Sequence, residues 1–137
     1  MLNYSTSLES SVLFIGIDLA WSPRKPSAGA VIAALGGEGK LVGWQQELGA
    51  DEEITAFVER WAGHGPTLVS IDAPLVVPNV EGSRPCDRDL SRDFHPFHAG
   101  AHPASRRLLG RYGEVRGERL LAHLLELGFT HGPHIEH

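Results

Sequence analysis

The chain has 137 residues, of which 42% are hydrophobic and 21% are charged. This length fits one domain with a buried core, and the composition excludes disordered, fibrous and low-complexity proteins. We therefore expect a single domain over residues 1–137, with residues 1–11 and 129–137 as loose ends. The one cysteine excludes an internal disulfide and a zinc site built from several cysteines.

No apolar run approaches the roughly 20 residues that span a bilayer, and the N-terminal stretch does not resemble a signal peptide. We therefore expect a cytoplasmic protein that does not enter a membrane. The net charge of −5 argues against nucleic acid as a partner of the chain as a whole. The charge is uneven, however, because residues 84–119 contain eight of the 12 basic residues and only five acidic ones. This asymmetry hints at an anionic ligand.

Three strands are expected in the first third of the chain. Residues 12–20 form a nearly continuous apolar run of the kind found in central strands. Residues 27–35 and 40–48 are two further strand candidates, and Gly36–Gly39 between them has the length of a hairpin connection. Together they predict an antiparallel meander.

The hydrophobic period then changes to that of a helix. Ile54, Phe57, Val58 and Trp61 share one face of a helix over residues 51–62, for which Asp51 can serve as the cap. Residues 67–73 are again a short apolar run, ended by Pro74, and predict a fourth strand.

The second half of the chain has a weaker pattern. Residues 76–106 contain four prolines and no sustained period, so most of this segment is expected to be loop. Pro103 can open a helix that ends at Tyr112. Residues 114–127 predict a further helix, in which three leucines face inward: Leu121, Leu124 and Leu125.

This order of elements brings two aspartates together. The helix over residues 51–62 is a crossover that lets the fourth strand run parallel to an earlier one. If the first and fourth strands are neighbours, Asp18 and Asp72 lie at the same edge of the sheet, about 5 Å apart. Two adjacent carboxylates repel each other unless a cation such as Mg²⁺ or Mn²⁺ lies between them. The alternative is that both aspartates only hydrogen-bond the loops they precede.

The sequence also resembles a known family in four segments. These are GIDLAW (16–21), IDAPLVVP (71–78), RPCDRDL (84–90) and HAGAHPAS (98–105). The first resembles the first catalytic segment of ribonuclease-H-like folds, which include Holliday-junction resolvases. All four together resemble the family of predicted ribonuclease-H-like nucleases that is catalogued as domain of unknown function 429.

The resemblance implies an α/β fold with a ribonuclease-H-like mixed sheet and two-metal-ion chemistry. It also implies that Asp18 and Asp72 bind the metal, and that Arg84 and Asp87 belong to the rim of the active site. Such folds supply further acidic residues from later strands and a C-terminal helix. Since none follow Gly128 except Glu136, we expect a C-terminally shortened version of the fold. Either Asp87 or another acid of the loop then completes the catalytic set, or the set stays incomplete and the fold is not active.

Other residues are candidates for holding a phosphate-bearing substrate. Arg84 and Arg88 can clamp phosphate, Lys25 can reach the edge that carries Asp18, and His98 and His102 can line an anionic pocket. A zinc site of histidines and Cys86 is disfavoured, because prolines and a glycine prevent a continuous helix there. A phosphate-binding P-loop and a Ser–His–Asp triad have no support in the sequence.

The first hypothesis is therefore a Mg²⁺- or Mn²⁺-dependent phosphodiester hydrolase, most simply a nuclease, with nucleic acid or another phosphate-bearing ligand as its partner. The second is a phosphotransferase of the actin-like superfamily, although residues 19–23 lack the glycine-rich nucleotide loop it needs. The third is a non-catalytic binding or assembly module of the same fold, in which an exposed apolar face mediates homodimer formation.

Overall fold

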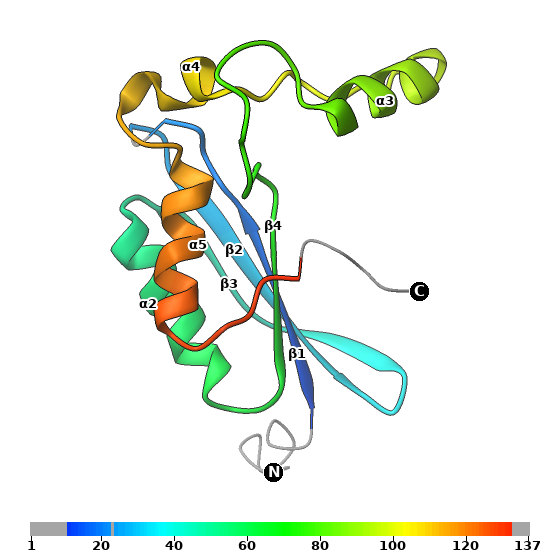
Figure 1. Ribbon diagram of the computed structural model, residues 1–137. Coiled ribbons are helices and arrows are strands. Elements are labelled where there is room, and N and C mark those ends of the chain that lie inside the picture. Colours follow the sequence, from blue (N-terminus) through cyan, green and yellow to red (C-terminus); the bar gives the residue numbers. More distant parts are fainter. Residues whose placement is uncertain (1–10, 23, 133–137) are drawn as a thin grey trace, which may run out of the picture. The chain divides into compact units, whose positions relative to one another are not determined.

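Four strands form one mixed sheet in the computed structural model of the protein, which describes residues 11–22 and 24–132 (Figure 1). Their order across the sheet is β3-β2-β1-β4. β1 pairs antiparallel with β2 and parallel with β4, and β2 pairs antiparallel with β3. The strands span Val12–Asp18 (β1), Ser27–Leu35 (β2), Glu38–Leu48 (β3) and Thr67–Ile71 (β4). The predicted meander and the parallel return of the fourth strand are both confirmed.

A two-residue turn joins β2 to β3. Gly36 and Gly37 both have positive φ, at 62° and 87°. Positive φ at both central residues matches the right-handed twist of the flanking strands, and glycine adopts it without steric cost. The tight turn lets pairing start at Glu38, so β3 begins two residues before the predicted Lys40.

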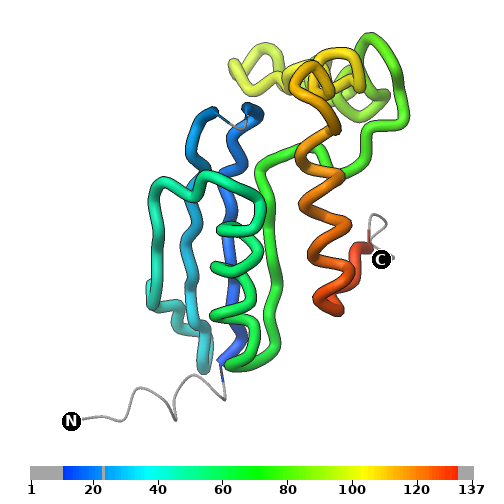
Figure 2. The backbone as a smooth tube through the Cα atoms, turned by 90° about the vertical axis from the view of Figure 1, so that its left-hand side faces the viewer, coloured from blue at the N-terminus to red at the C-terminus, as the bar shows by residue number. Residues whose placement is uncertain are grey.

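Helix α2, Asp51–Ala62, covers one face of the sheet (Figure 2). Ile54, Phe57 and Val58 are fully buried on its inner side. Phe57 lies directly on Gly29 of β2, where an added Cβ would be 2.6 Å from the ring carbon Cε1. A side chain at position 29 would therefore push the helix away from the sheet.

The predicted cap of α2 is wrong. The N-cap residue is Ala50, while Asp51 is the first residue of the helix and is buried. The carboxylate that serves this helix end is Glu53, whose Oε2 accepts a hydrogen bond of 2.6 Å from the Gly49 amide. Acidic residues in the first turn also complement the positive end of the helix dipole.

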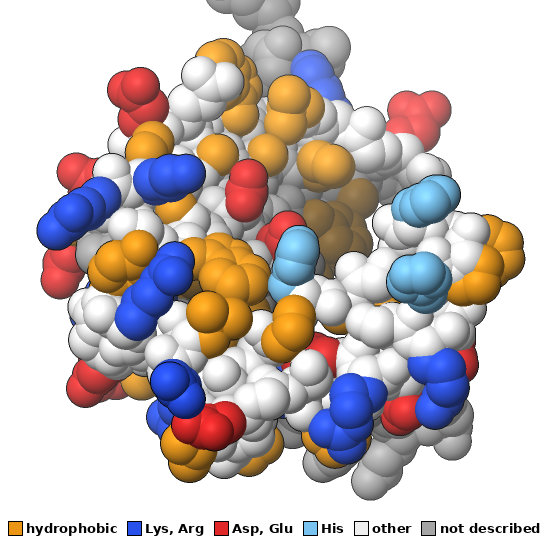
Figure 3. Space-filling view, turned by 90° about the horizontal axis from the view of Figure 1, so that it is seen from above, with side chains coloured by type: hydrophobic (Ala, Val, Ile, Leu, Met, Phe, Trp, Pro, Cys, Tyr) orange, Lys and Arg blue, Asp and Glu red, His pale blue; other side chains and the backbone are white. Residues whose placement is uncertain are grey.

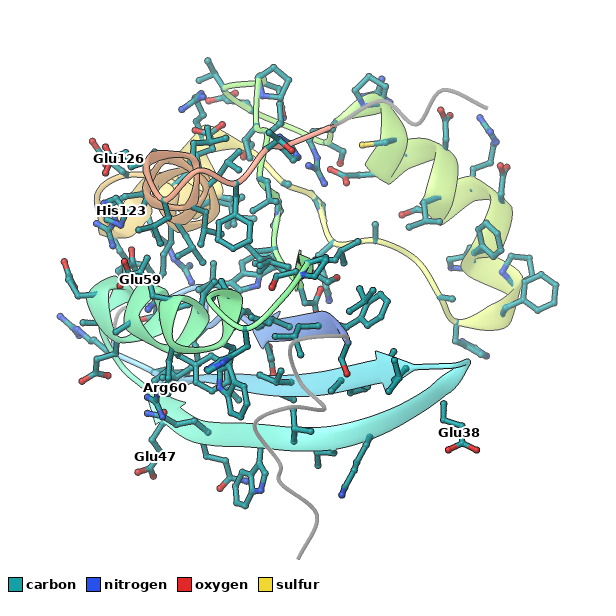
Figure 4. All side chains as sticks on the ribbon, turned by 90° about the horizontal axis from the view of Figure 1, so that it is seen from below. Glu38, Glu47, Glu59, Arg60, His123 and Glu126 are labelled. Atoms are coloured by element: carbon teal, nitrogen blue, oxygen red, sulfur yellow. The ribbon has the colours of Figure 1, made fainter. Side chains whose placement is uncertain are left out.

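The strands alternate between two environments. In β1 the side chains of Leu13, Ile15 and Ile17 are buried toward α2, and the residues between them are exposed. Figure 4 shows α2, with Glu59 and Arg60 labelled, on one side of the sheet, and side chains that point away from it on the other. No other described element of residues 11–73 covers that second side.

The structure divides into two compact units, Met1–Ala73 (unit 1) and Pro74–His137 (unit 2). Unit 1 holds the sheet and α2. The described residues of unit 2 contain helices and loops but no strand. The helices are α3 (Pro85–Phe94), η1 (His95–Phe97), α4 (Arg106–Leu109), η2 (Gly110–Tyr112) and α5 (Arg116–Glu126). Together the units make a mixed α/β fold, as the sequence predicts, and it is compatible with a ribonuclease-H-like architecture. No described helix is both long and apolar enough to cross a membrane.

Most of residues 76–106 is loop, as the sequence predicts, but the segment also contains helix α3, which the sequence does not predict. It starts with Pro85 at its first position, which suits proline because no hydrogen-bond donor is needed there. Its only buried residue is Asp87, whereas Leu90 and Phe94 are 45% and 47% exposed. The helix therefore has no buried apolar stripe, and the periodicity of the sequence gives no signal for it.

The last two helices differ from the prediction at their starts and in their faces. α4 begins after Ser105, whose Oγ accepts a hydrogen bond from the Leu108 amide, and not at Pro103. In α5 the buried leucines are Leu120 and Leu124, which share a face with Gly117. Leu121 lies at the flank of that face and Leu125 is 47% exposed, so only Leu124 of the three predicted leucines is buried.

Candidate functional site

Asp18 and Asp72 lie side by side at one edge of the sheet in unit 1. Asp18 is the last residue of β1, and Asp72 follows directly after β4. These strands are parallel, their last registered pair is Ile17 with Ile71, and the Asp72 amide donates a hydrogen bond of 2.9 Å to the Ile17 carbonyl. The two aspartates therefore occupy the next position in register, on neighbouring strands about 4.8 Å apart.

Both carboxylates are exposed, and no described residue hydrogen-bonds or ion-pairs with either of them. The alternative role, in which each side chain hydrogen-bonds the loop it precedes, is therefore not seen among residues 11–22 and 24–132. Mg²⁺ commonly takes one or two protein carboxylates and completes its shell with water and substrate phosphate. The described residues contain no cluster of three or more potential ligands from His, Cys, Asp and Glu. Two exposed carboxylates without a protein partner are thus suited to a Mg²⁺ or Mn²⁺ ion that keeps several water ligands, and not to an ion whose ligands all come from the protein.

The loop after β1 begins beside these acids. The Ala20 amide donates to the hydroxyl of Ser27 at the start of β2, over 3.1 Å, which ties the two ends of the loop together. Within the loop the Lys25 amide donates to the Ser22 carbonyl, and the Lys25 side chain is exposed. The predicted substrate-binding residue Lys25 is therefore accessible to solvent in the segment that leaves the Asp18 end of the sheet.

The predicted rim residues Arg84 and Asp87 are bound to each other in unit 2. Asp87 is buried, and its two oxygens accept hydrogen bonds from the Arg84 backbone amide, Nε and Nη2, the last at 2.7 Å. It also accepts one from the Ala104 amide. The Arg84 guanidinium lowers the pKa of Asp87 below its ordinary value, mainly through these hydrogen bonds, and Asp87 raises the pKa of Arg84.

Through these contacts Arg84 and Asp87 stabilise the start of α3. Arg84 is the N-cap of α3 and Asp87 the third residue of the helix, and the Asp87 carboxylate reaches back to the Arg84 backbone amide, which is one half of a capping box. The remaining Arg84 nitrogen, Nη1, donates to the Val76 carbonyl. The bond from Ala104 then holds the start of α3 to a segment 17 residues further along the chain.

The other predicted substrate-binding residues also belong to unit 2. Arg88 donates from Nη1 to the Ser83 carbonyl over 2.6 Å and is otherwise exposed. His98 ends η1 in the left-handed conformation with φ 56°, and His102 is exposed. Basic side chains in this region alternate with acids along the sequence. On the face that Figure 3 shows, Lys and Arg side chains (blue) form separate patches among acidic and apolar side chains. Arg92, for example, pairs with both Asp89 and Asp93.

Two polar residues that the sequence reasoning missed fix the loops of unit 2. The Asn79 amide group donates to three carbonyls, including that of Ala104 at 2.9 Å. Ser91 of α3 both donates to the Ala101 carbonyl and accepts from the Ala101 amide, over 3.1 Å each. An asparagine between Pro78 and Val80 in a proline-rich segment is the signal that could have indicated such a turn.

Unit 2 also contains a cavity of about 520 Å³ that the sequence does not reveal. Its lining includes Arg106 and Arg119 together with Glu114 and Glu118. Arg106 forms an ion pair of 3.0 Å with Glu118, and Glu118 also accepts from the Val77 amide. Because both signs of charge are present and partly neutralise each other, the cavity does not select for an anion or a cation.

Comparison with known proteins identifies a family. The family model described as "Protein of unknown function (DUF429)" matches residues 16–133, which include Asp18, Asp72 and all the other candidate site residues. No curated protein and no solved structure matches the chain. The resemblance seen in the four sequence segments is thereby confirmed at the level of the family, and the chain belongs to the family of unknown function DUF429.

Proposed function

We propose that the protein is a divalent-cation-dependent phosphodiester hydrolase, and most simply a nuclease, with Asp18 and Asp72 as its cation-binding residues. The observation that carries this proposal is the placement of two exposed carboxylates on adjacent parallel strands, with no partner among the described residues. Ligands of open α/β sheets gather at the carboxyl ends of the strands, which is where both aspartates lie.

The chemistry expected at this pair follows from its charge. Two carboxylates on neighbouring strands create a negative potential that favours a hard cation with oxygen ligands. When bound, such a cation neutralises charge on a phosphoryl oxygen and lowers the pKa of water. Asp18 and Asp72 hold and orient the cation, and the exposed ammonium of Lys25 is available to contact a phosphate oxygen of the substrate.

The first experiment measures cation binding directly. Mn²⁺ is titrated into the wild-type protein and into Asp18→Asn, Asp72→Asn and the double variant by calorimetry. We expect each single variant to weaken binding at least tenfold, and the double variant to abolish it. Because Mn²⁺ is paramagnetic, amide signals near residues 18 and 72 should broaden selectively in NMR spectra of the wild type.

Glu38→Gln provides the matched control, since Glu38 is an exposed acid of the same sheet at the start of β3, away from the Asp18 end. It should bind Mn²⁺ as the wild type does. Cleavage of single-stranded, duplex and branched nucleic acids with Mn²⁺ then tests the activity. Unchanged Mn²⁺ affinity in the double variant would refute the cation site, and cleavage that persists in Asp18→Asn would refute its catalytic use.

A second candidate function is a non-catalytic assembly module. It is favoured by a separate observation, the large apolar side chains exposed on the sheet face opposite α2. Side chains two residues apart on a strand share a face, so Asp18 lies at the end of the same face of β1 as Phe14. The two functions are therefore tested by separate substitutions, at the aspartates and at the apolar residues.

A further inference from the structure

The loop that joins β1 to β2 is fixed to the sheet at both of its ends. Leu19 is buried directly after Asp18, and Ser27 is buried at the start of β2. The Ala20 amide donates to the Ser27 hydroxyl over 3.1 Å, and Asp18 itself pairs with Ala28 of β2. The first residues of the loop are therefore held close to Asp18.

Trp21 comes directly after this fixed start, and its side chain is 43% exposed. No described residue accepts a hydrogen bond from its indole nitrogen. Trp61, by contrast, packs against Gly43 of β3. Trp21 follows Asp18 by three residues, so the two Cα atoms lie at most about 11 Å apart. Since one strand of a duplex rises about 3.4 Å per nucleotide, this indole is within about three nucleotides of a phosphate bound at Asp18.

The loop also carries positive charge within an acidic unit. Unit 1 contains nine acidic and four basic residues, but Arg24 and Lys25 are the only charged residues between Asp18 and Glu38. Both side chains are exposed, and neither forms an ion pair with a described residue. The Arg24 amide donates to the Ser22 hydroxyl over 3.2 Å, and the Lys25 amide donates to the Ser22 carbonyl. These bonds keep the two basic residues near the residue that follows Trp21.

The charge at this end of the sheet depends on whether a divalent cation is bound. The charges of the two aspartates and of the two basic residues of the loop cancel, so a bound Mg²⁺ leaves a net charge of about +2. The other acidic residues of unit 1 repel a phosphate backbone. A nucleic acid is therefore expected to contact unit 1 over a short stretch at this end, and more strongly when the cation is present.

We propose that Trp21 stacks on a base of a single-stranded nucleic acid whose phosphates contact Arg24 and Lys25. Single strands are then the substrate class of the Asp18–Asp72 site, so this inference rests on the proposed function. Aromatic side chains combined with basic ones are the usual means of binding single strands without sequence preference. In a duplex the faces of each base are covered by its neighbours, and a base must first be unstacked before an indole can contact it.

Fluorescence anisotropy with a short labelled oligothymidylate and a labelled hairpin duplex tests the proposal. Both probes carry phosphorothioate linkages, so that they stay intact. In the presence of Mg²⁺ the wild type should bind the single strand about tenfold or more tightly than the duplex. Trp21→Ala should weaken binding of the single strand by about fivefold to hundredfold, the range that one stacked base accounts for, and should leave binding of the duplex unchanged.

Trp21→Phe keeps an aromatic face and should weaken binding less than Trp21→Ala does. The unlabelled single strand should quench the tryptophan fluorescence of the wild type. In Trp21→Phe this quenching should disappear although binding persists, which assigns the stacked base to position 21. Because Trp21 is exposed, circular dichroism and the urea midpoint of both variants should match those of the wild type.

Trp44→Ala is the matched control, because Trp44 is another tryptophan of unit 1, is 64% exposed and lies on the edge strand β3. It should bind both probes as the wild type does. Equal affinities of the wild type for the two probes would overturn the proposal, as would equal effects of Trp21→Ala and Trp44→Ala.

Removal of Mg²⁺ with EDTA separates this inference from the proposed function. EDTA should weaken binding of the single strand by the wild type but not by the Asp18→Asn, Asp72→Asn double variant. Binding that depends on Trp21 but is the same with EDTA would refute the cation site and leave the stacking of Trp21 supported. A protein that binds Mg²⁺ and cleaves, but prefers the duplex, would refute the single-strand inference alone.

Discussion

Replacing Asp87 by alanine removes the acceptor that joins the start of α3 to Ala104. The carboxylate accepts bonds from three nitrogens of Arg84 and from one backbone amide, and its side chain is only 5% exposed. Removing one partner of a buried ion pair costs about 3–5 kcal/mol when the other partner stays buried. The Arg84 side chain is 20% exposed and keeps its bond to Val76, so part of this cost is recovered by hydration. We therefore expect a loss of about 2–4 kcal/mol in the free energy of unfolding of unit 2.

Equilibrium urea unfolding followed by far-UV circular dichroism measures this loss. With a slope of about 2 kcal/mol/M, the midpoint should fall by about 1–2 M. Asp89→Ala on the same helix is the control, because Asp89 is 62% exposed and its ion pair with Arg92 is worth less than about 1 kcal/mol. If Asp87→Ala and Asp89→Ala shift the midpoint equally, Asp87 does not anchor the start of the helix and this explanation is wrong.

Two further predictions rest on the described contacts. The pKa of Asp87 is lower in the folded protein than in the unfolded chain, so the ionised carboxylate stabilises the folded state. This stabilisation is complete above the pKa of the unfolded chain, about 3.9, and is lost as the pH falls through the lower pKa of the folded protein. Urea titrations of the wild type should therefore show a loss of stability below about pH 4, and Asp87→Asn should lack that component. In the sheet, Gly29→Val should lower the free energy of unfolding, measured by thermal unfolding, by about 1–3 kcal/mol, because the added side chain meets Phe57. The added Cβ of Gly16→Ala meets nothing, so this variant should change the free energy of unfolding by less than about 0.5 kcal/mol. Equal melting temperatures for these two variants would contradict the close packing of α2 on β2.

The elements of unit 1 could be predicted from the sequence because burial there follows a regular period. Along β1 every second residue is buried, and along α2 the buried residues Ile54, Phe57 and Val58 recur at helical spacing. The spacing of buried residues follows from the geometry of the strand or helix, so it is visible in the sequence without knowledge of the element that packs against it. The helix between the third and fourth strands is long enough to be a crossover, which makes it possible for the fourth strand to run parallel to an earlier one.

Unit 2 could be predicted less well, because polar contacts position its segments. The buried residue of α3 is an aspartate, and the helix is held by Arg84, Ala104 and the Ser91–Ala101 pair. These contacts span 3, 10 and 17 residues of the chain, so they leave no repeating pattern in the sequence. The same argument applies to α5, where hydrophobicity alone does not distinguish the buried Leu120 from the exposed Leu125.

This difference also bears on the candidate site. Position on the sheet brings Asp18 and Asp72 together, and no described residue competes for their carboxylates. The family resemblance implies that Arg84 and Asp87 belong to the rim of the site. In the structure these two residues pair with each other at the start of α3. A residue that must bind a cation or phosphate needs unused hydrogen-bonding capacity, and the bonds among Arg84, Asp87, Val76 and Ala104 use most of it. At the Asp18 end of the sheet, the described side chains that keep this capacity include the two aspartates and the exposed Lys25, which is why the proposed chemistry depends on them.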